Sequence, residues 1–312
     1  MGKLEATRQK AGNNVRAKGQ PSAASLWIEG KGAAISRMTG AIVRALLVVV
    51  LVSIPSILLP GVTSDSAQVV ALIAIFGAGL TIFEYASTYP SLVEFRDAPP
   101  FNRVRFVSLF LTVFLLTVIL RGAYEPTTLT RFVTAVGDII GRAIDFPYSP
   151  VRLIVLMLPD STSVNDMILI RIAAGISYLI SLITLAVFLI LIRVQSWPSA
   201  DRPFNVWVNM PTFDPTAGGD VVARLIRDAR VNIILGFLLP FLIPATVKAA
   251  STIFTPITLD SPQTLVWTMS AWAFLPASLF MRGIAMGRIA AMISEKRRQE
   301  AVEPDGSGFQ PA

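Results

Sequence analysis

The sequence predicts an all-α polytopic membrane protein with about six transmembrane helices and further amphipathic helices in the membrane interface. Of its 312 residues, 53% are hydrophobic and only 15% are charged, whereas about 25% of the residues in a soluble domain are charged. The apolar residues also form uninterrupted runs, and about 20 helical residues suffice to cross about 30 Å of hydrocarbon. Both observations indicate that hydrocarbon, rather than water, surrounds most of the chain.

Residues 1–38 form a polar and basic segment ahead of the first apolar run. No small-residue cleavage site follows that run, although a secretory signal peptide would need one. We therefore interpret residues 1–38 as a retained cytoplasmic tail.

The apolar runs lie in a transmembrane domain that we assign to residues 39–290, and residues 291–312 form a second tail. The predicted spans cover about residues 41–60, 68–88, 104–121, 167–193, 232–250 and 265–285. Placing both tails and the loops after the second and fourth spans on one side gathers most of the 27 Lys and Arg residues there. The positive-inside rule then predicts both termini in the cytoplasm. The composition is typical of a bacterial inner membrane.

Two shorter segments have the pattern of amphipathic helices. Over residues 130–146, apolar side chains at helical spacing oppose Arg131, Asp138 and Arg142, which predicts a helix lying in the interface, with a lid or pore helix as the alternative. Residues 219–230 show a similar pattern directly before the fifth span. The apolar run inside residues 147–159 is too short to cross a bilayer, so it is either re-entrant or interfacial.

The composition also excludes several classes of site. The chain contains no Cys and no His, which removes disulfides, thiolate or imidazole metal sites and histidine-ligated haem. We therefore predict no cofactor and no catalytic or metal-binding residue. The net charge of +7 comes from residues that flank apolar runs, so we predict the lipid bilayer, anionic headgroups and other membrane proteins as partners, and no nucleic acid.

Arg44 and Glu84 are ionisable residues inside the first two apolar runs. They are equally far from the turn near residue 64, so an antiparallel hairpin places them at the same height. Glu84 also continues a stripe of small residues, which a membrane helix turns toward its neighbours. We predict an ion pair between Arg44 and Glu84. The alternatives are two side chains that reach the interface separately and a coupling role for Glu84.

The fifth predicted span contains Gly236, Pro240 and Pro244. Proline removes a backbone donor and frees a carbonyl, and broken helices of this kind line binding sites in many transporters. These three residues are therefore a candidate broken-helix site, although a kink without a ligand is the alternative.

Charged residues also gather in the predicted cytoplasmic loops. Arg224, Arg227 and Arg230 are candidate contacts for anionic lipid headgroups, and a surface for a partner protein is the alternative. The carboxylates there could hold a divalent cation if they converged: Glu94, Asp97, Asp201, Asp214 and Asp220. The two loops share a similar stretch, RDAPPFN at residues 96–102 and ADRPFN at residues 200–205. We interpret it as common turn chemistry, with a duplicated hairpin as the alternative.

Because almost no polar side chain enters the predicted spans, the chain has little with which to bind a hydrophilic cargo. We therefore expect a non-catalytic scaffold, assembly factor or accessory subunit of a membrane complex. One alternative is a small transporter or channel that uses the broken helix at residues 232–250. Another is a membrane-embedded lipid-modifying enzyme. A water-accessible cavity beside Pro240 and Pro244 would favour transport, and a solid apolar bundle would favour the scaffold.

Overall fold

A computed structural model describes residues 23–198, 204–251, 253, 259 and 261–302 of the chain. In this part the chain forms helices and no strands. The helices are α2 (Ala23–Leu58), α3 (Ser64–Ala86), α4 (Phe101–Tyr124), α5 (Thr128–Ile144), α6 (Pro150–Met157), α7 (Val164–Val194), α8 (Val206–Asn209), α9 (Val221–Ala250) and α10 (Pro262–Val302). The predicted all-α class is confirmed.

Among the described residues, 6 helices are long and apolar enough to cross a membrane. The candidate spans are Ile35–Leu58, Ser64–Ala86, Phe101–Tyr124, Val164–Val194, Val221–Ala250 and Pro262–Gln299. The chain is therefore a multi-pass membrane protein. Both end helices continue beyond their apolar runs, since α2 begins at Ala23 and α10 ends at Val302. Of the two predicted tails, residues 1–22 and 303–312 lie outside the described part.

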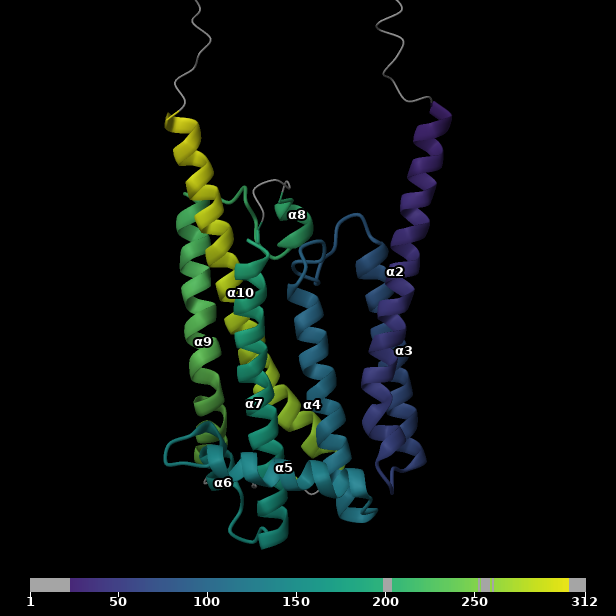
Figure 1. The fold of residues 1–312 in the computed structure, drawn as a ribbon, viewed down its shortest axis with the longest axis vertical. Coiled ribbons are helices and arrows are strands. Elements are labelled where there is room, and N and C mark those ends of the chain that lie inside the picture. Colours follow the sequence, from purple (N-terminus) through teal and green to yellow (C-terminus); the bar gives the residue numbers. More distant parts are fainter. Residues whose placement is uncertain (1–22, 199–203, 252, 254–258, 260, 303–312) are drawn as a thin grey trace, which may run out of the picture.

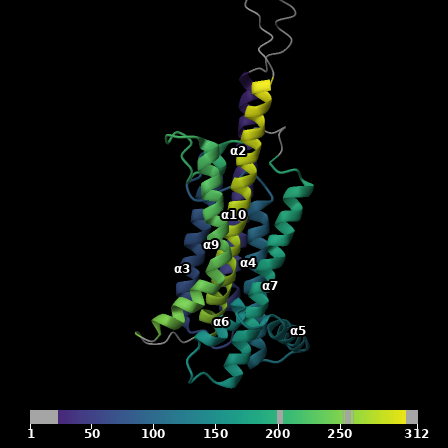
Figure 2. The same ribbon diagram turned by 90° about the vertical axis from the view of Figure 1, so that its left-hand side faces the viewer.

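Both ends of the described chain lie at the same end of the molecule (Figure 1). We call this end the terminal face, and it also carries α8 and the loops that follow α3 and α7. The opposite end, which we call the α5 face, carries α5 and α6. There α5 runs across the long helices, and Figure 2 shows it projecting to one side of them.

The long helices fall into two groups. α2 and α3 form an antiparallel hairpin at one side of the molecule (Figure 1), and in the described part α3 contacts no helix other than α2. The small residues of α3 face this partner: Ala74 is buried, and the Cβ position of Gly77 lies 3.3 Å from Val48. α4, α7, α9 and α10 form a bundle, which the hairpin joins through α2.

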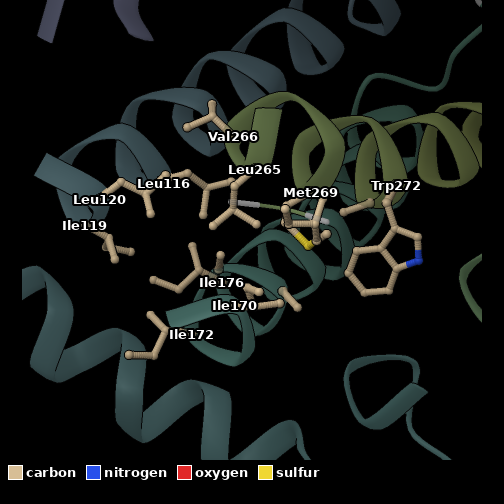
Figure 3. Packing of buried hydrophobic residues seen from close by; sticks show 14 of the residues in the cluster. Leu116, Ile119, Leu120, Ile170, Ile172, Ile176, Leu265, Val266, Met269 and Trp272 are labelled. Atoms are coloured by element: carbon tan, nitrogen blue, oxygen red, sulfur yellow. The ribbon is translucent and has the colours of Figure 1, made fainter. Parts of the chain in front are cut away.

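The bundle encloses two apolar cores. The core nearer the α5 face is shown in Figure 3, where side chains of α4, α7 and α10 meet. It includes Leu116, Ile119, Ile172, Ile176, Met269 and Trp272. The second core lies near the terminal face and contains aromatic residues from both loops, together with Met281, Met286 and Ile289 of α10. α10 therefore contributes to both cores, with Pro276 between the two sections.

Glycine allows close contacts between α9 and α10 and between α5 and α7. On α9, a Cβ at Gly236 would lie 2.7 Å from the backbone nitrogen of Phe280 and from the carbonyl oxygen of Pro276 in α10. Where α5 crosses α7, a Cβ at Gly175 would lie 2.7 Å from the Cα of Gly141. Real Cβ atoms do not fit at such distances, so these helix backbones touch in the way typical of membrane helices with small residues at their crossing points.

The shorter elements of the two faces begin at residues that satisfy free backbone donors. Thr127 forms a capping box with Thr130 at the start of α5, and Ser149 caps α6 just before Pro150. α6 corresponds to the apolar run in residues 147–159 and packs beside α7 and α9. The amphipathic segment predicted at residues 219–230 leads directly into the fifth span, and in the structure α9 covers Val221–Ala250 as one continuous helix.

Candidate functional site

Four polar side chains from four segments meet near the terminal face. Arg282 of α10 donates from Nε to Glu94 Oε2 at 2.6 Å and from Nη2 to Glu94 Oε1 at 2.8 Å. Its Nη1 donates to Asn232 Oδ1 of α9 at 3.1 Å, and its Nη2 to Thr212 Oγ1 at 3.2 Å. Thr212 also donates to Glu94. We call these four residues the Glu94–Arg282 cluster.

The cluster joins the two loops of the terminal face to the bundle. Glu94 lies in the loop after α3, and Thr212 lies in the segment between α8 and α9. The loop after α3 also contacts α8 directly, because Phe95 donates its backbone N–H to the carbonyl of Asn209, the last residue of α8, at 2.7 Å. Asp97 likewise donates its backbone N–H to the Asn209 side chain at 3.0 Å. The stretch RDAPPFN is therefore part of a loop–loop contact.

An aromatic layer lies on the bundle side of this contact. The rings of Phe95 and Phe101 are 4.5 Å apart, and Phe101 also meets Phe188 of α7 at 5.8 Å. Trp197, from the other loop, packs edge-on against Phe95. Since aromatic pairs prefer such tilted and edge-to-face arrangements, the layer packs both loops against the bundle through buried rings.

The charges of the cluster are largely compensated within it. The side chain of Glu94 is 12% exposed and that of Arg282 is 26% exposed. A bidentate pair between a guanidinium and a carboxylate is the strongest form of such a contact. Arg105 adds a further positive charge that interacts with Glu94, and its guanidinium lies over the rings of Phe101 and Phe274. The arrangement binds segments together and presents no free nucleophile.

The remaining carboxylates of this face are engaged separately. Asp97 pairs with Arg96, and Asp214 accepts from Thr216. Asp220 caps α9 at Ala223 and pairs with Arg297 at 2.7 Å. These hydrogen bonds lower the pKa of Asp214, through Thr216, and the pKa of Asp220, through Arg297. In the described part of the chain no three carboxylates converge, and Asp201 lies outside it. The arrangement that the enzyme alternative requires is therefore not formed by the described residues.

Glu84 is buried and binds backbone rather than Arg44. Its carboxylate accepts the N–H groups of Ser91, Leu92 and Val93 at 3.0 Å each, and the Ser91 hydroxyl at 2.6 Å. These donors belong to the chain just after α3, so Glu84 fixes the loop that carries Glu94. Arg96 completes the connection by donating to the carbonyls of Glu84 and Ser87 at the end of α3.

Arg44 lies beside α3 but makes a different contact from the predicted one. Its guanidinium is 4.6 Å from the ring centre of Tyr85, and its Nη1 donates to the carbonyl of Gly40 at 2.7 Å. No ion pair among the described residues joins Arg44 to Glu84. The predicted ion pair does not form because the loop after α3 turns back and donates its backbone N–H groups to Glu84. The spacing of Arg44 and Glu84 along the two helices does not indicate the path of this loop.

The broken-helix residues of α9 are packed against α10. Pro244 has no N–H, so the carbonyl of Pro240, one turn earlier, has no helical partner. Trp272 of α10 donates its Nε1–H to that carbonyl at 3.1 Å. At Gly236, the backbone of Pro276 and Phe280 leaves no room for a side chain. Two cavities, of about 620 and 510 Å³, lie near the α5 face and are not lined by these residues.

The three arginines at the start of α9 differ from one another. Arg224 donates to the carbonyls of Asp214 and Ala217 and lies over the ring of Phe213, so it organises the loop before α9. Arg227 forms an exposed pair with Asp228, and Arg230 is exposed. The structure thus leaves two of the three guanidinium groups directed outward.

Sequence reasoning missed the central role of Arg282. It lies inside the span that we predicted at residues 265–285 and within the candidate span of α10, but we assigned it no role. Its partners come from segments far apart in the sequence, Glu94 and Asn232 among them. In the sequence, the only sign of its role is that Arg282 stands among apolar residues and precedes Gly283. This pattern does not indicate which residue Arg282 binds.

Comparison with family models, with curated proteins and with solved structures gives no match.

Proposed function

We propose that this chain is a non-catalytic membrane scaffold, assembly factor or accessory subunit of a membrane complex. We place it in a bacterial inner membrane with both termini in the cytoplasm, because the basic residues gather at the terminal face and its predicted tails. Its role is to hold other membrane proteins together through its lipid-facing helix surfaces.

The observation that carries the proposal is the closed packing between α9 and α10. A carbonyl freed by proline is a typical ligand for a transported ion. Here the carbonyl of Pro240 already accepts from Trp272, and a hydrogen atom is all that fits at Gly236. This favours a solid bundle over the transporter alternative.

The distribution of charge supports the same reading. Two buried or largely buried carboxylates near the terminal face have fixed partners: Glu94 binds Arg282, and Glu84 binds the N–H groups of residues 91–93. A coupling group in a transporter must instead exchange its proton or ion during the cycle. Fixed partners of this kind suit a rigid structural protein.

α3 is the surface that we assign to partner binding. It presents exposed apolar side chains away from α2, including Leu72, Phe76 and Phe83. Its last turn is held by the Glu84 and Arg96 contacts, which connect to the loops of the terminal face. A rigid apolar strip outside the main bundle is suited to lateral association with another membrane helix.

Anionic headgroups are a second proposed partner. Arg227 and Arg230 extend outward at the terminal end of α9, and each basic residue near an anionic surface contributes about 1 kcal/mol of attraction. We propose that this pair positions the terminal face on the cytoplasmic leaflet.

Purification of the tagged full chain in polymer nanodiscs tests the proposal. We expect the wild-type chain to carry a partner in fixed stoichiometry. The double variant Leu72→Ala with Phe76→Ala should lose that partner and keep its thermal stability. Phe237→Ala, which shortens an exposed side chain of α9, is the matched control and should retain the partner.

Two results would overturn the proposal. One is a wild-type chain that is homogeneous and partnerless in nanodiscs prepared from its native membrane. The other is solute or ion flux in proteoliposomes that is abolished by Trp272→Phe, because such flux would indicate that the contact between α9 and α10 belongs to a transport pathway.

A further inference from the structure

A pocket near the α5 face combines apolar walls with three arginines. It has a volume of about 510 Å³ and lies between the end of α4, α5 and the start of α7. We call it the α5 pocket. Its apolar walls come from α4 and α7: Ile119, Ala123, Ile168, Leu169 and Ile172.

The polar lining of the α5 pocket carries more positive than negative charge. Arg131, Arg142 and Arg171 line it together with one carboxylate, Asp138. Asp138 pairs with Arg142 through one oxygen and with Arg171, at 3.5 Å, through the other. Arg131 is exposed and forms no ion pair among the described residues. Two guanidinium groups therefore share one carboxylate while a third remains uncompensated.

Arg171 has an unused donor in this position. Its Nε is buried and has no hydrogen-bond partner among the described residues. Asp145 lies 4.0 Å from Arg171 but forms its closer contact, at 2.9 Å, with Arg152. A buried charged donor without a partner costs free energy. Arg171 also lines the α5 pocket, so its contacts within the protein leave part of a pocket-lining guanidinium group unsatisfied.

The apolar surfaces beside the α5 pocket indicate whether a ligand would reach it from the bilayer or from water. α5 exposes an apolar stripe on the side away from α7, formed by Leu129, Phe132, Val136 and Ile139. α7 begins beyond its crossing with α5, and its first turns also expose apolar side chains, Val164, Met167 and Ile168. Apolar surface on both sides places the pocket at the headgroup level of the bilayer rather than in open water.

We propose that the α5 pocket binds the phosphate group of an anionic phospholipid from the leaflet at the α5 face. Arg131, Arg142 and Arg171 form the phosphate site, and the lipid chains lie along the apolar stripe of α5. Guanidinium groups suit phosphate because their planar donors bind two oxygens at once. This site is separate from the arginines of α9, which lie at the opposite end of the molecule, and it does not depend on the proposed scaffold role.

The test uses the full chain in phosphatidylcholine nanodiscs that contain a minor share of phosphatidylglycerol. Native mass spectrometry measures which lipid remains bound to the protein after the protein is released from the nanodisc. We expect the wild-type chain to retain phosphatidylglycerol preferentially. Arg131→Gln should reduce this preference about fivefold, the effect of one basic residue at a membrane surface. Arg131→Lys should restore most of it.

Two further variants separate lipid binding from general effects of charge. Arg121→Gln is the matched control, because Arg121 lies near the same face, pairs with Glu125 at 2.7 Å and does not line the pocket. It should leave the preference unchanged. Asp138→Asn removes the negative charge and should raise the preference, whereas a purely structural role for Asp138 predicts no rise.

A second arm distinguishes the lipid from a soluble anion. Glycerol 3-phosphate is titrated into nanodiscs of phosphatidylcholine alone. Tight binding of this anion that depends on Arg131 would overturn the lipid assignment. Equal retention of phosphatidylglycerol by the wild type, Arg131→Gln and Arg121→Gln would overturn the site itself. Arg131 has no ion pair to lose, so its variants should fold, and thermal unfolding verifies this.

Discussion

The hairpin of α2 and α3 and the pair of α9 and α10 are both apolar antiparallel helix pairs, yet they pack differently. The most apolar window is 28% buried in α2 and 6% buried in α3, against 17% in α9 and 50% in α10, so α3 and α10 are the two extremes. α9 and α10 touch through backbone at Gly236, whereas in the hairpin Gly77 meets a side chain of Val48. Apolar composition therefore does not determine burial in a membrane protein. Small residues and hydrogen bonds between helices decide it, because lipid is as apolar as the helices themselves.

The largest expected effect comes from adding one methyl group to a glycine in each pair. In Gly236→Ala, the new Cβ meets backbone atoms of α10 at 2.7 Å, so α9 and α10 must separate, at a cost of about 3 kcal/mol. In Gly79→Ala, nothing lies within 4 Å of the new Cβ, and the higher helix propensity of alanine adds up to about 1 kcal/mol. Reversible unfolding in mixed micelles measures both. Equal effects would mean that the two pairs are packed alike.

The second comparison removes one arginine from each region. Arg282→Gln leaves Glu94 without its main partner, and we expect a loss of about 2 kcal/mol after allowing for partial exposure of the pair. Arg44→Gln removes no ion pair within the described part of the chain, only the contacts with Tyr85 and Gly40, and we expect a loss below about 1 kcal/mol. The same unfolding measurement applies. Because Glu84 binds backbone, the combined swap of Arg44→Glu and Glu84→Arg should be no better tolerated than the single changes, and a rescue would contradict the structure.

A smaller effect concerns the hydrogen bond that joins α9 to α10. Trp272→Phe leaves the carbonyl of Pro240 without a donor, and we expect a loss of about 1 kcal/mol. Pro244→Ala returns an N–H at the position that normally bonds this carbonyl. The double variant should therefore lose less stability than the two single changes together. Additive losses in a double-mutant cycle would show that the carbonyl is not the point of contact.

The smallest effect is a dependence on pH at the start of α9. The N-cap of α9 is Asp220, whereas α3 is capped by Thr63, which does not titrate. Hydrogen bonds from Arg297 and from the backbone lower the pKa of Asp220 below its ordinary value of 3.8. A lowered pKa in the folded state means that the contribution of this cap is complete above the ordinary value and is lost as the pH falls through the folded one.

Hydrogen exchange measures this difference directly. As the pH falls below 3.8 and through the lowered pKa of Asp220, the protection of the Ala223 amide should fall relative to that of Ser66, whose acceptor is Thr63. Asp220→Asn should remove the pH dependence at Ala223. A parallel change at both amides would indicate a global loss of structure instead of a local titration.

Much of the fold could be predicted from the sequence because the length of an apolar run is a local property. The fourth span was predicted at residues 167–193, and α7 covers Val164–Val194. The amphipathic pattern at residues 130–146 corresponds to α5 at Thr128–Ile144. The amphipathic pattern at residues 219–230 was predicted to lie directly before the fifth span, and α9 continues without a break from Val221 to Ala250.

The polar contacts could not be predicted to the same degree. Height along two helices placed Arg44 and Glu84 together, but the actual donors to Glu84 are backbone groups of the following loop. Glu94 and Arg282 are separated by 188 positions. Each carboxylate had several arginines within reach in principle, and only the path of the chain selects among them.

The sequence by itself determined the all-α class, the number of spans and the absence of every site that needs cysteine or histidine, because these depend on composition and on the length of apolar runs. The tertiary structure decided three further features. Trp272 donates a hydrogen bond to the carbonyl of Pro240, which has no helical donor because residue 244 is proline. Glu94 pairs with Arg282, and α3 contacts only α2 among the described helices. These contacts depend on which helix faces approach one another. In lipid that choice depends on shape and on individual hydrogen bonds, which no single segment of the chain encodes.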